Sequence, residues 1–269
     1  MTERRVIHRA SLEERGIANE PNFRVIEEGD GYVVVDKPAP LLVHPSTPGN
    51  PPTLQDGLVG LLAYELANGG QVSLINRLDR ETSGIVLVAI TPARAREFHM
   101  AMEHRRFRKR YQALCHGWPE WQDYHLVAPI LRRSEIEPSP IWVKQIVHDD
   151  GAKCETGFRV LKRMTTADGG KMSLIEALPV TGRMHQIRVH LAHLGYPIVG
   201  DKIYGQDETC YLDFIEAGWT DDLAQRLILP RHALHSTHLA LCEEDSEDLA
   251  FSWQSDFPAE LILKARSLG

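Results

Sequence analysis

Short apolar runs separated by turn-forming residues recur along the chain and predict β-strands. The runs are rich in β-branched and aromatic side chains, and one of them alternates apolar and polar residues like a strand with one solvated face. Strands are expected at residues 31–36, 41–45, 85–91, 108–116 and 232–241, and in the segments DYHLVAPI, PIWVKQIVH, ETGFRVLKR and MSLIEALPV in the middle of the chain.

Segments whose apolar residues recur about every 3.6 positions predict helices. The clearest is residues 181–195, where Thr181 can cap the start and Gly195 suits a left-handed exit. Its expected buried stripe consists of Met184, Ile187, Leu191 and Leu194. Further helices are expected at residues 54–67, 92–105 and 258–267.

Strands outnumber helices and the two do not alternate regularly. This order predicts an α+β fold with a mixed or mainly antiparallel sheet. Residues 1–25 are polar and are interpreted as an N-terminal leader, which leaves residues 26–269 as one domain. Residues 45–53 (PSTPGNPPT) are expected to be a loop and, with an insert at residues 206–230, could gate a cleft.

Composition is that of an ordinary globular protein, with 43% hydrophobic and 25% charged residues in 269. No apolar run approaches the roughly 20 residues of a membrane helix, and the charged N-terminus has no apolar signal core. We therefore expect a cytoplasmic protein that does not enter a membrane. The four cysteines form no CxxC pair and are expected to be buried thiols.

Charge is unevenly distributed along the chain. The net charge is −7, but arginines and a lysine outnumber glutamates between residues 94 and 110, whereas acid gathers in segments such as EEDSED at residues 243–248. The basic residues could form a face that binds nucleic acid on an otherwise acidic protein. A charged helix exposed to solvent explains the same residues equally well.

The stretch INRLDRETSG (residues 75–84) places Asp79 between Arg77 and Arg80, at a bend between two expected strands. A carboxylate near cations stays ionised at neutral pH, which suits a nucleophile or a base. A structural ion pair would have the same residues. The string alone does not distinguish a catalytic carboxylate from a structural one.

The helix beginning near residue 183 carries Arg183, Gln186, His190 and His193 on one face. Such a face can bind phosphates or a buried carboxylate, or it can simply be exposed. Arg188 lies roughly 140° further around the helix. The histidine spacing does not suit a metal site, and no P-loop, GxGxxG or GxSxG motif occurs, so no metal or other cofactor is expected.

Five strings in order resemble the RluA family of RNA pseudouridine synthases, over about four-fifths of the chain. They are YVVVDKPAPLLVHPS (32–46), INRLDRETSGIVLVA (75–89), RKRYQALCHG (108–117), TGRMHQIRVHLAHLGYPIVGDKIYG (181–205) and RHALHSTHLAL (231–241). The resemblance implies a mixed central sheet in two halves with a catalytic cleft between them, and it makes residues 26–269 the catalytic domain. It implies that a uridine in structured RNA is isomerised to pseudouridine without a cofactor.

The resemblance also assigns roles to residues. Asp79 matches the catalytic aspartate, which would attack the substrate or abstract a sugar proton, and both routes stay open. Arg183 matches its partner cation, and Tyr111 matches the tyrosine that packs on the target base. Because the base must leave the helical stack, Arg77 would fill the vacated space. Arg80 keeps a structural role.

RNA contacts are expected from the basic segment and the helix that follows residue 183. The predicted RNA-binding residues are Arg77, Arg106, Arg108, Lys109, Arg110, Gln186 and Arg188.

Two departures from the family stand out. Many members carry His where this chain has Asn76, and many carry an N-terminal S4 domain, for which too few residues precede the first expected strand. We expect a monomer that binds a ribosomal or transfer RNA stem-loop and needs no protein partner. An inactive RNA-binding protein that keeps the fold is the alternative, although binding alone does not require Asp79, Tyr111 and Arg183.

Overall fold

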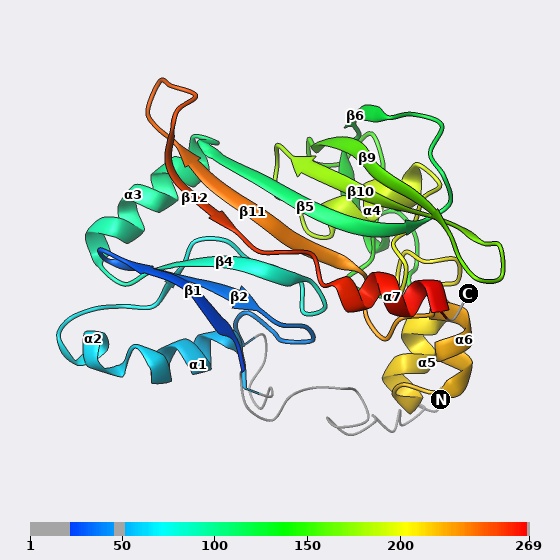
Figure 1. Cartoon of the computed structure of the whole chain (residues 1–269), viewed down its shortest axis with the longest axis horizontal. Coiled ribbons are helices and arrows are strands. Elements are labelled where there is room, and N and C mark those ends of the chain that lie inside the picture. The colour runs from blue at the N-terminus through cyan, green and yellow to red at the C-terminus, as the bar shows by residue number, and fades with distance from the viewer. Residues whose placement is uncertain (1–21, 46–51, 268–269) are drawn as a thin grey trace.

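The computed structural model describes residues 22–45 and 52–267 as one ten-stranded sheet with helices on both faces and a separate two-stranded sheet (Figure 1). In chain order the elements are β1 (Arg24–Gly29), β2 (Tyr32–Lys37), α1 (Leu54–Leu61), α2 (Ala63–Ala67), β3 (Ser73–Leu74), β4 (Ser83–Ala89), α3 (Pro92–Glu103), β5 (Phe107–His116), β6 (Asp123–Val127), β7 (Ile130–Arg132), the 3-10 helix η1 (Arg133–Glu135), β8 (Gln145–Val147), β9 (Glu155–Thr165), β10 (Lys171–Pro179), α4 (Gln186–His193), α5 (Thr209–Ala217), α6 (Asp221–Leu227), β11 (Leu234–Cys242), β12 (Leu249–Gln254) and α7 (Ala259–Ser267).

The large sheet has the order β1-β2-β4-β11-β5-β10-β9-β6, with β3 beside β4 and β12 beside β11. Only β4 and β11 pair in parallel among the described strands, and they do so over a short register that sets Ser236 opposite Gly84. This pair joins two antiparallel halves, as Figure 1 shows. The predicted α+β fold with a mixed, mainly antiparallel sheet is confirmed.

Gly84 permits the close approach at this junction. Its φ is +110°, and a Cβ at this position would lie 2.3 Å from the carbonyl oxygen of Ser236. Any other residue would push β4 and β11 apart, because L side chains rarely adopt this backbone conformation. The glycine that ends INRLDRETSG therefore holds the two halves of the sheet together.

Both faces of the sheet are packed near its centre, which is why β2 and β4 read as continuous apolar runs rather than alternating ones. In β2, Val33 and Val35 belong to a core that also includes residues of α1, α4 and α7. Tyr32 and Val34 belong to a second core that includes Phe98 of α3. The elements that carry the site are thus held by packing from two sides.

Most expected elements occur near their predicted positions, but the segment 41–45 is not a strand. The carbonyls of Leu42 and Val43 instead accept hydrogen bonds from the backbone at the start of α1. Of the expected strand PIWVKQIVH only the three residues of β8 pair. The pattern did not predict β1, β12, α5 or α6, whereas β3 lies in the apolar run that was expected to precede the bend at Asp79. Most of the loop 45–53 and of the leader lies outside the described residues.

The helix predicted from residue 181 begins only at Gln186. His185 precedes it with φ +58°, a left-handed conformation that interrupts the helix. Met184 is therefore 43% exposed instead of lying in the buried stripe. The left-handed exit at Gly195 is confirmed by its φ of +86°.

All four cysteines are buried and free, as predicted. Within the described ranges, no helix combines the length and apolarity required to cross a bilayer.

Candidate active site

A cleft of about 1170 Å³ opens at the junction of the two sheet halves. Its walls are formed mainly by the loop between β3 and β4 (residues 75–82), by β5, and by residues 179–188, which lead into α4. Asp79, Tyr111 and Arg183, which were predicted to form the site, all line this cleft. The structure thus brings together three segments that are far apart in the sequence.

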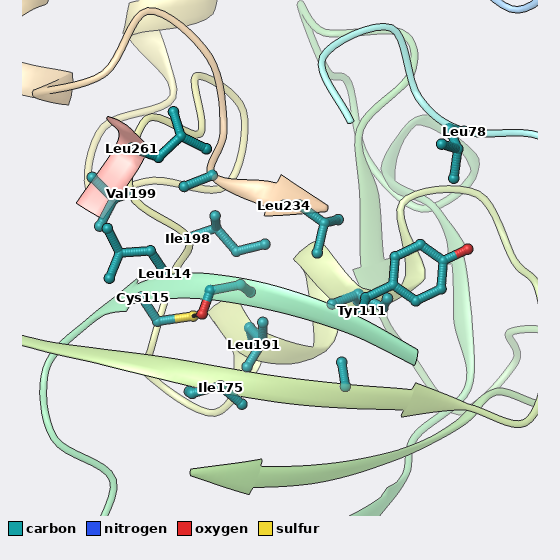
Figure 2. Packing of buried hydrophobic residues seen from close by; sticks show 14 of the residues in the cluster. Leu78, Tyr111, Leu114, Cys115, Ile175, Leu191, Ile198, Val199, Leu234 and Leu261 are labelled. Carbon is teal, nitrogen blue, oxygen red and sulfur yellow. Dashed lines mark hydrogen bonds between the residues drawn. The ribbon is translucent and has the colours of Figure 1, made fainter. Parts of the chain in front are cut away.

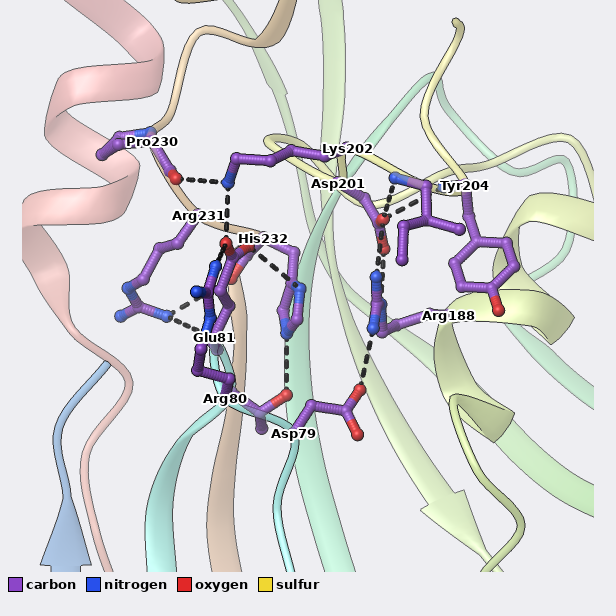
Figure 3. Close-up of polar contacts among 12 residues, drawn as sticks. Asp79, Arg80, Glu81, Arg188, Asp201, Lys202, Tyr204, Pro230, Arg231 and His232 are labelled. Atoms are coloured by element: carbon purple, nitrogen blue, oxygen red, sulfur yellow. Dashed lines mark hydrogen bonds and ion pairs between the residues drawn. The ribbon is translucent and has the colours of Figure 1, made fainter. Parts of the chain in front are cut away.

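Asp79 is held by Arg188 of α4, as Figure 3 shows. The guanidinium donates from Nη1 to Oδ2 of Asp79 at 2.9 Å, and from Nε and Nη2 to the two oxygens of Asp201 at 2.7 and 2.9 Å. The arginine side chain is buried, whereas Asp79 keeps 28% of its side chain exposed. One carboxylate is therefore anchored by a buried cation while remaining accessible from the cleft.

Arg188 keeps Asp79 ionised. Burial alone would raise the pKa of this carboxyl, but the charges of His185, Arg188 and His232 and the hydrogen bond from Arg188 hold it at about 2. Burial lowers the pKa of His185 to about 4 and that of His232 to about 3, so both imidazoles are neutral at pH 7. At neutral pH the cation responsible is therefore Arg188.

The prediction that Arg183 is the partner cation of Asp79 is wrong. Arg183 precedes α4, is exposed, and directs its Nε to the carbonyl of Lys153 at 3.3 Å. The resemblance assigned this role to Arg183, and the helix expected from residue 181 agreed with it, because that helix placed Arg183 on a polar face able to bind a carboxylate. A usable signal was present, because Arg188 lies three residues before Leu191 of the expected buried stripe, and a buried arginine requires carboxylate partners.

Asn76 fastens the start of the Asp79 loop to β4. Its amide Nδ2 donates to the carbonyl of Ile85 at 3.0 Å, and its Oδ1 accepts from the backbone N–H of Leu87 at 2.8 Å. Asn76 thus pairs with β4 much as a strand backbone would. Neither bond needs a titratable ring.

The other end of the loop is fastened by two buried lysines. Lys37 of β2 donates to the carbonyls of Leu41 and Arg80 at 2.8 and 3.2 Å. Lys202 donates to Glu81 at 2.8 Å (Figure 3). Arg80 also pairs with Glu81, at 3.1 Å, which agrees with its expected structural role.

Glu81 lies in an ion pair that stabilises the loop at neutral pH and is lost in acid. Burial would raise its pKa, but Lys202, His232 and Arg80 hold it at about 2, below its ordinary 4.5. Because the folded pKa is the lower one, the stabilisation is present above about pH 4.5 and is lost as the pH falls toward 2. Glu81→Gln should lower the free energy of unfolding by about 3 kcal/mol at pH 6.

Urea unfolding at a series of pH values measures this effect. The difference between wild type and Glu81→Gln should shrink below pH 4.5 and be nearly absent at pH 2. The exposed Glu97, which pairs with Arg94 on the surface of α3, provides the control, and Glu97→Gln should change stability by less than about 0.5 kcal/mol at every pH. A difference for Glu81→Gln that does not vary with pH would contradict the ion-pair account.

Tyr111 lies on β5 at the border between the cleft and the main core. Figure 2 shows its ring beside Leu234, with the hydroxyl turned toward the side of Leu78. Burial raises the pKa of this phenol to about 12, so it is protonated at neutral pH. Tyr111 can pack against a planar nucleobase and donate or relay a proton. Because it is protonated, it does not act as a general base at neutral pH.

Known proteins resemble this chain in both sequence and fold. A family model described as RNA pseudouridylate synthase matches residues 31–193. The chain is 33% identical over 251 residues to the ribosomal large subunit pseudouridine synthase D of Zymomonas mobilis, covering 90% of this chain and 71% of that protein. It is 31% identical over 189 residues to the dual-specificity RNA pseudouridine synthase RluA of Vibrio vulnificus, covering 70% and 72%.

The chain belongs to the RluA family of RNA pseudouridine synthases. A further relative, an uncharacterized RNA pseudouridine synthase of Chloroflexus aurantiacus, is 36% identical over 239 residues, or 87% of this chain and 65% of that protein. Two solved human structures support the fold. RNA Pseudouridylate Synthase Domain Containing 1 has a TM-score of 0.62 at 21% identity, with 91% and 95% of the two chains covered. Domain Containing 4 has a TM-score of 0.64 at 23% identity, with 90% and 91% covered.

The predicted RNA-binding residues of this pseudouridine synthase divide into two groups. Arg77 and Lys109 line the cleft, and Arg108 and Arg110 are exposed. The other three form hydrogen bonds within the protein. The guanidinium of Arg106 donates to the carbonyl of Cys242, the amide of Gln186 bonds to Glu155, Thr156 and Thr181, and Arg188 binds Asp79.

For Gln186 and Arg188 the expectation of a direct RNA contact is corrected, because both side chains are buried and bonded to groups of the protein. Arg106 is only half-buried, and its RNA contact stays a prediction. In the described parts of the synthase, no group of three or more His, Cys, Asp or Glu side chains could hold a metal ion.

Proposed function

We propose that Asp79 is the essential group with which this synthase isomerises a uridine of structured RNA. The observation that carries the proposal is the geometry of Asp79, an ionised carboxylate that is open to the cleft on one side and fixed by the buried Arg188 on the other. A fixed, ionised carboxylate suits both chemical routes, attack on the sugar and abstraction of a sugar proton.

The reaction breaks the bond between N1 of uracil and C1′ of ribose and forms a bond between C5 and C1′. The hydrogen on C5 is released and N1 gains a proton, so the atoms balance without a cofactor. Tyr111, protonated at neutral pH, is placed to pack on the uracil and to relay protons as it turns. Arg188 would hold Asp79 in position throughout.

The target base has to leave its helical stack to reach Asp79 in the cleft. Arg77 is exposed on the same loop two residues before Asp79, which supports a role in filling the space that the base vacates. The relatives named for the ribosomal large subunit make large-subunit ribosomal RNA the first substrate pool to test. Recognition of a local stem-loop shape is consistent with the size of the cleft.

Tritium release tests the proposed reaction. RNA labelled with tritium at C5 of uridine, isolated from cells that lack the gene, should release tritium to water when the wild-type protein is added. Carbodiimide labelling of the same RNA should then map a new pseudouridine. RNA binding without tritium release would support the alternative, an inactive RNA-binding protein that keeps the fold.

Lys109 should contribute one phosphate contact to RNA binding. It lines the cleft, and burial lowers its pKa, which indicates a cation without a compensating carboxylate. Lys109→Met should reduce the slope of log K against log salt concentration by about 0.7 to 0.9. The exposed Lys162 of β9, outside the cleft, gives the control Lys162→Met, which should leave the slope unchanged. Equal slopes for wild type and Lys109→Met would exclude the contact.

A further inference from the structure

His185 occupies a strained position at the wall of the cleft. It is the residue before α4, its φ is +58° and ψ 15°, and its side chain caps no backbone group of the helix. A left-handed conformation is unfavourable for a residue other than glycine, and such strain persists where the surrounding structure enforces it. Two neighbours, Tyr204 and Asp79, show what the imidazole does in this position.

Tyr204 fixes the imidazole ring. Its hydroxyl lies 2.8 Å from Nδ1 of His185, and its ring meets the imidazole edge-on with centroids 5.5 Å apart. The same hydroxyl oxygen accepts a hydrogen bond from the backbone N–H of Gln145 at 2.9 Å. The guanidinium of Arg188 lies over the ring of Tyr204, with its central carbon 5.0 Å from the ring centroid.

These contacts favour one tautomer of His185. The Tyr204 oxygen already accepts from Gln145, so its own proton is free to be donated to Nδ1. The imidazole is neutral because burial lowers its pKa to about 4. With Nδ1 as the acceptor, the single ring proton is on Nε2. His185 therefore directs an N–H donor toward the cleft.

The Nε2 donor faces Asp79 without reaching it. Nε2 lies 3.9 Å from Oδ2 of Asp79, which is too long for a hydrogen bond. An oxygen about 2.8 Å from both atoms would complete the arrangement, accepting from Nε2 and donating to the carboxylate at an angle of roughly 90°. A hydroxyl group has both capacities, whereas a carbonyl oxygen can only accept.

We propose that His185 and Asp79 together bind the 2′-hydroxyl of the target ribose, so that His185 selects RNA over DNA. The inference rests on the proposed function, in which Asp79 acts at C1′ or C2′ of that sugar. The 2′-hydroxyl is attached to C2′ and is the sugar hydroxyl nearest to C1′. A 2′-hydroxyl is also the group by which a protein distinguishes RNA from DNA at a given site.

Binding of heptauridylate and heptadeoxyuridylate tests the proposal, because single strands pay no cost of unpairing. All proteins carry Asp79→Asn, which keeps the size of the side chain and an acceptor oxygen at Asp79 while preventing turnover. This parent protein should bind the ribo-oligomer at least about tenfold more tightly than the deoxy-oligomer. Adding His185→Asn should reduce the ratio to a few-fold at most.

The variants are chosen to separate recognition from folding. Asparagine tolerates the left-handed backbone and its shorter amide can still face Tyr204, but it ends before the position of Nε2. His193→Asn, the same change at an exposed histidine of α4, should leave the ratio unchanged. His185→Gln places an amide N–H nearer to the position of Nε2 and should restore part of the discrimination.

Three results would overturn the proposal. The first is equal affinity of the parent protein for the ribo- and deoxy-oligomers. The second is an unchanged affinity ratio after His185→Asn. The third is an equal loss of affinity for both oligomers after His185→Asn, which would mean that His185 acts through Asp79 or the fold. Failure of the proposed function would be seen elsewhere, as absence of tritium release from uridine-labelled RNA by the wild-type protein. The binding ratio needs no turnover, so the two failures are distinguishable.

Discussion

Replacing Asp79 by asparagine is expected to reduce pseudouridine formation at least about 10³-fold. Asparagine keeps the shape and one acceptor oxygen, so the contact with Arg188 survives as a weaker hydrogen bond. The amide is neither a nucleophile nor a base, so the chemical step loses the group that drives it. Single-turnover tritium release from uridine-labelled RNA measures the loss, and RNA affinity should change by less than about tenfold.

Asp123 provides the matched control for this change. It is an exposed carboxylate on β6 that pairs with Arg159 outside the cleft, so Asp123→Asn should leave tritium release unchanged. If Asp79→Asn retained a tenth or more of the wild-type rate, Asp79 would not be the essential group. A parallel loss of RNA affinity and rate would instead indicate that the loop had been displaced.

Replacing Arg188 by methionine is expected to have the second-largest effect. The change leaves Asp79 and Asp201 as buried or partly buried carboxylates without their shared cation. Breaking a buried ion pair by removing one partner typically costs 3–5 kcal/mol, about the loss expected here in the free energy of unfolding. Tritium release should fall by at least about 100-fold, because the pKa of Asp79 rises and its position is no longer fixed.

Arg183→Met is the matched control, the same change five positions earlier at an exposed arginine. It should alter stability by less than about 0.5 kcal/mol and the rate by only a few-fold. Urea unfolding and single-turnover rates measure both variants. If Arg188→Met does not fold, Arg188→Lys keeps the charge without the bidentate geometry and should fold with a reduced rate. A larger rate loss for Arg183→Met would contradict the assignment.

The two arginines show where pattern analysis of this chain reaches its limit. Both stand in the string TGRMHQIR, and an ideal helix drawn through that string puts Arg183 in its first turn. In the structure His185 is left-handed, the helix begins one residue later, and Arg188 faces Asp79 and Asp201. The contacts of Arg188, which neither the helical pattern nor the resemblance predicted, show which cation binds the carboxylate.

The sequence by itself determined the fold class, the family and the residue at the centre of the site. Apolar periodicity reports burial on each element, and the long ordered strings identify the family, so neither depends on how distant segments meet. Asp79 was found because its whole string is distinctive.

Only the tertiary structure decided which groups contact that residue. Arg188 contacts Asp79, and Lys202 contacts the neighbouring Glu81, only after the two halves of the sheet join at β4 and β11. Asn76 likewise differs from the usual family residue in sequence, yet its role became evident only from its two bonds to β4. Contacts of this kind depend on the distances between segments. The periodicity of apolar residues along one segment gives no information on those distances.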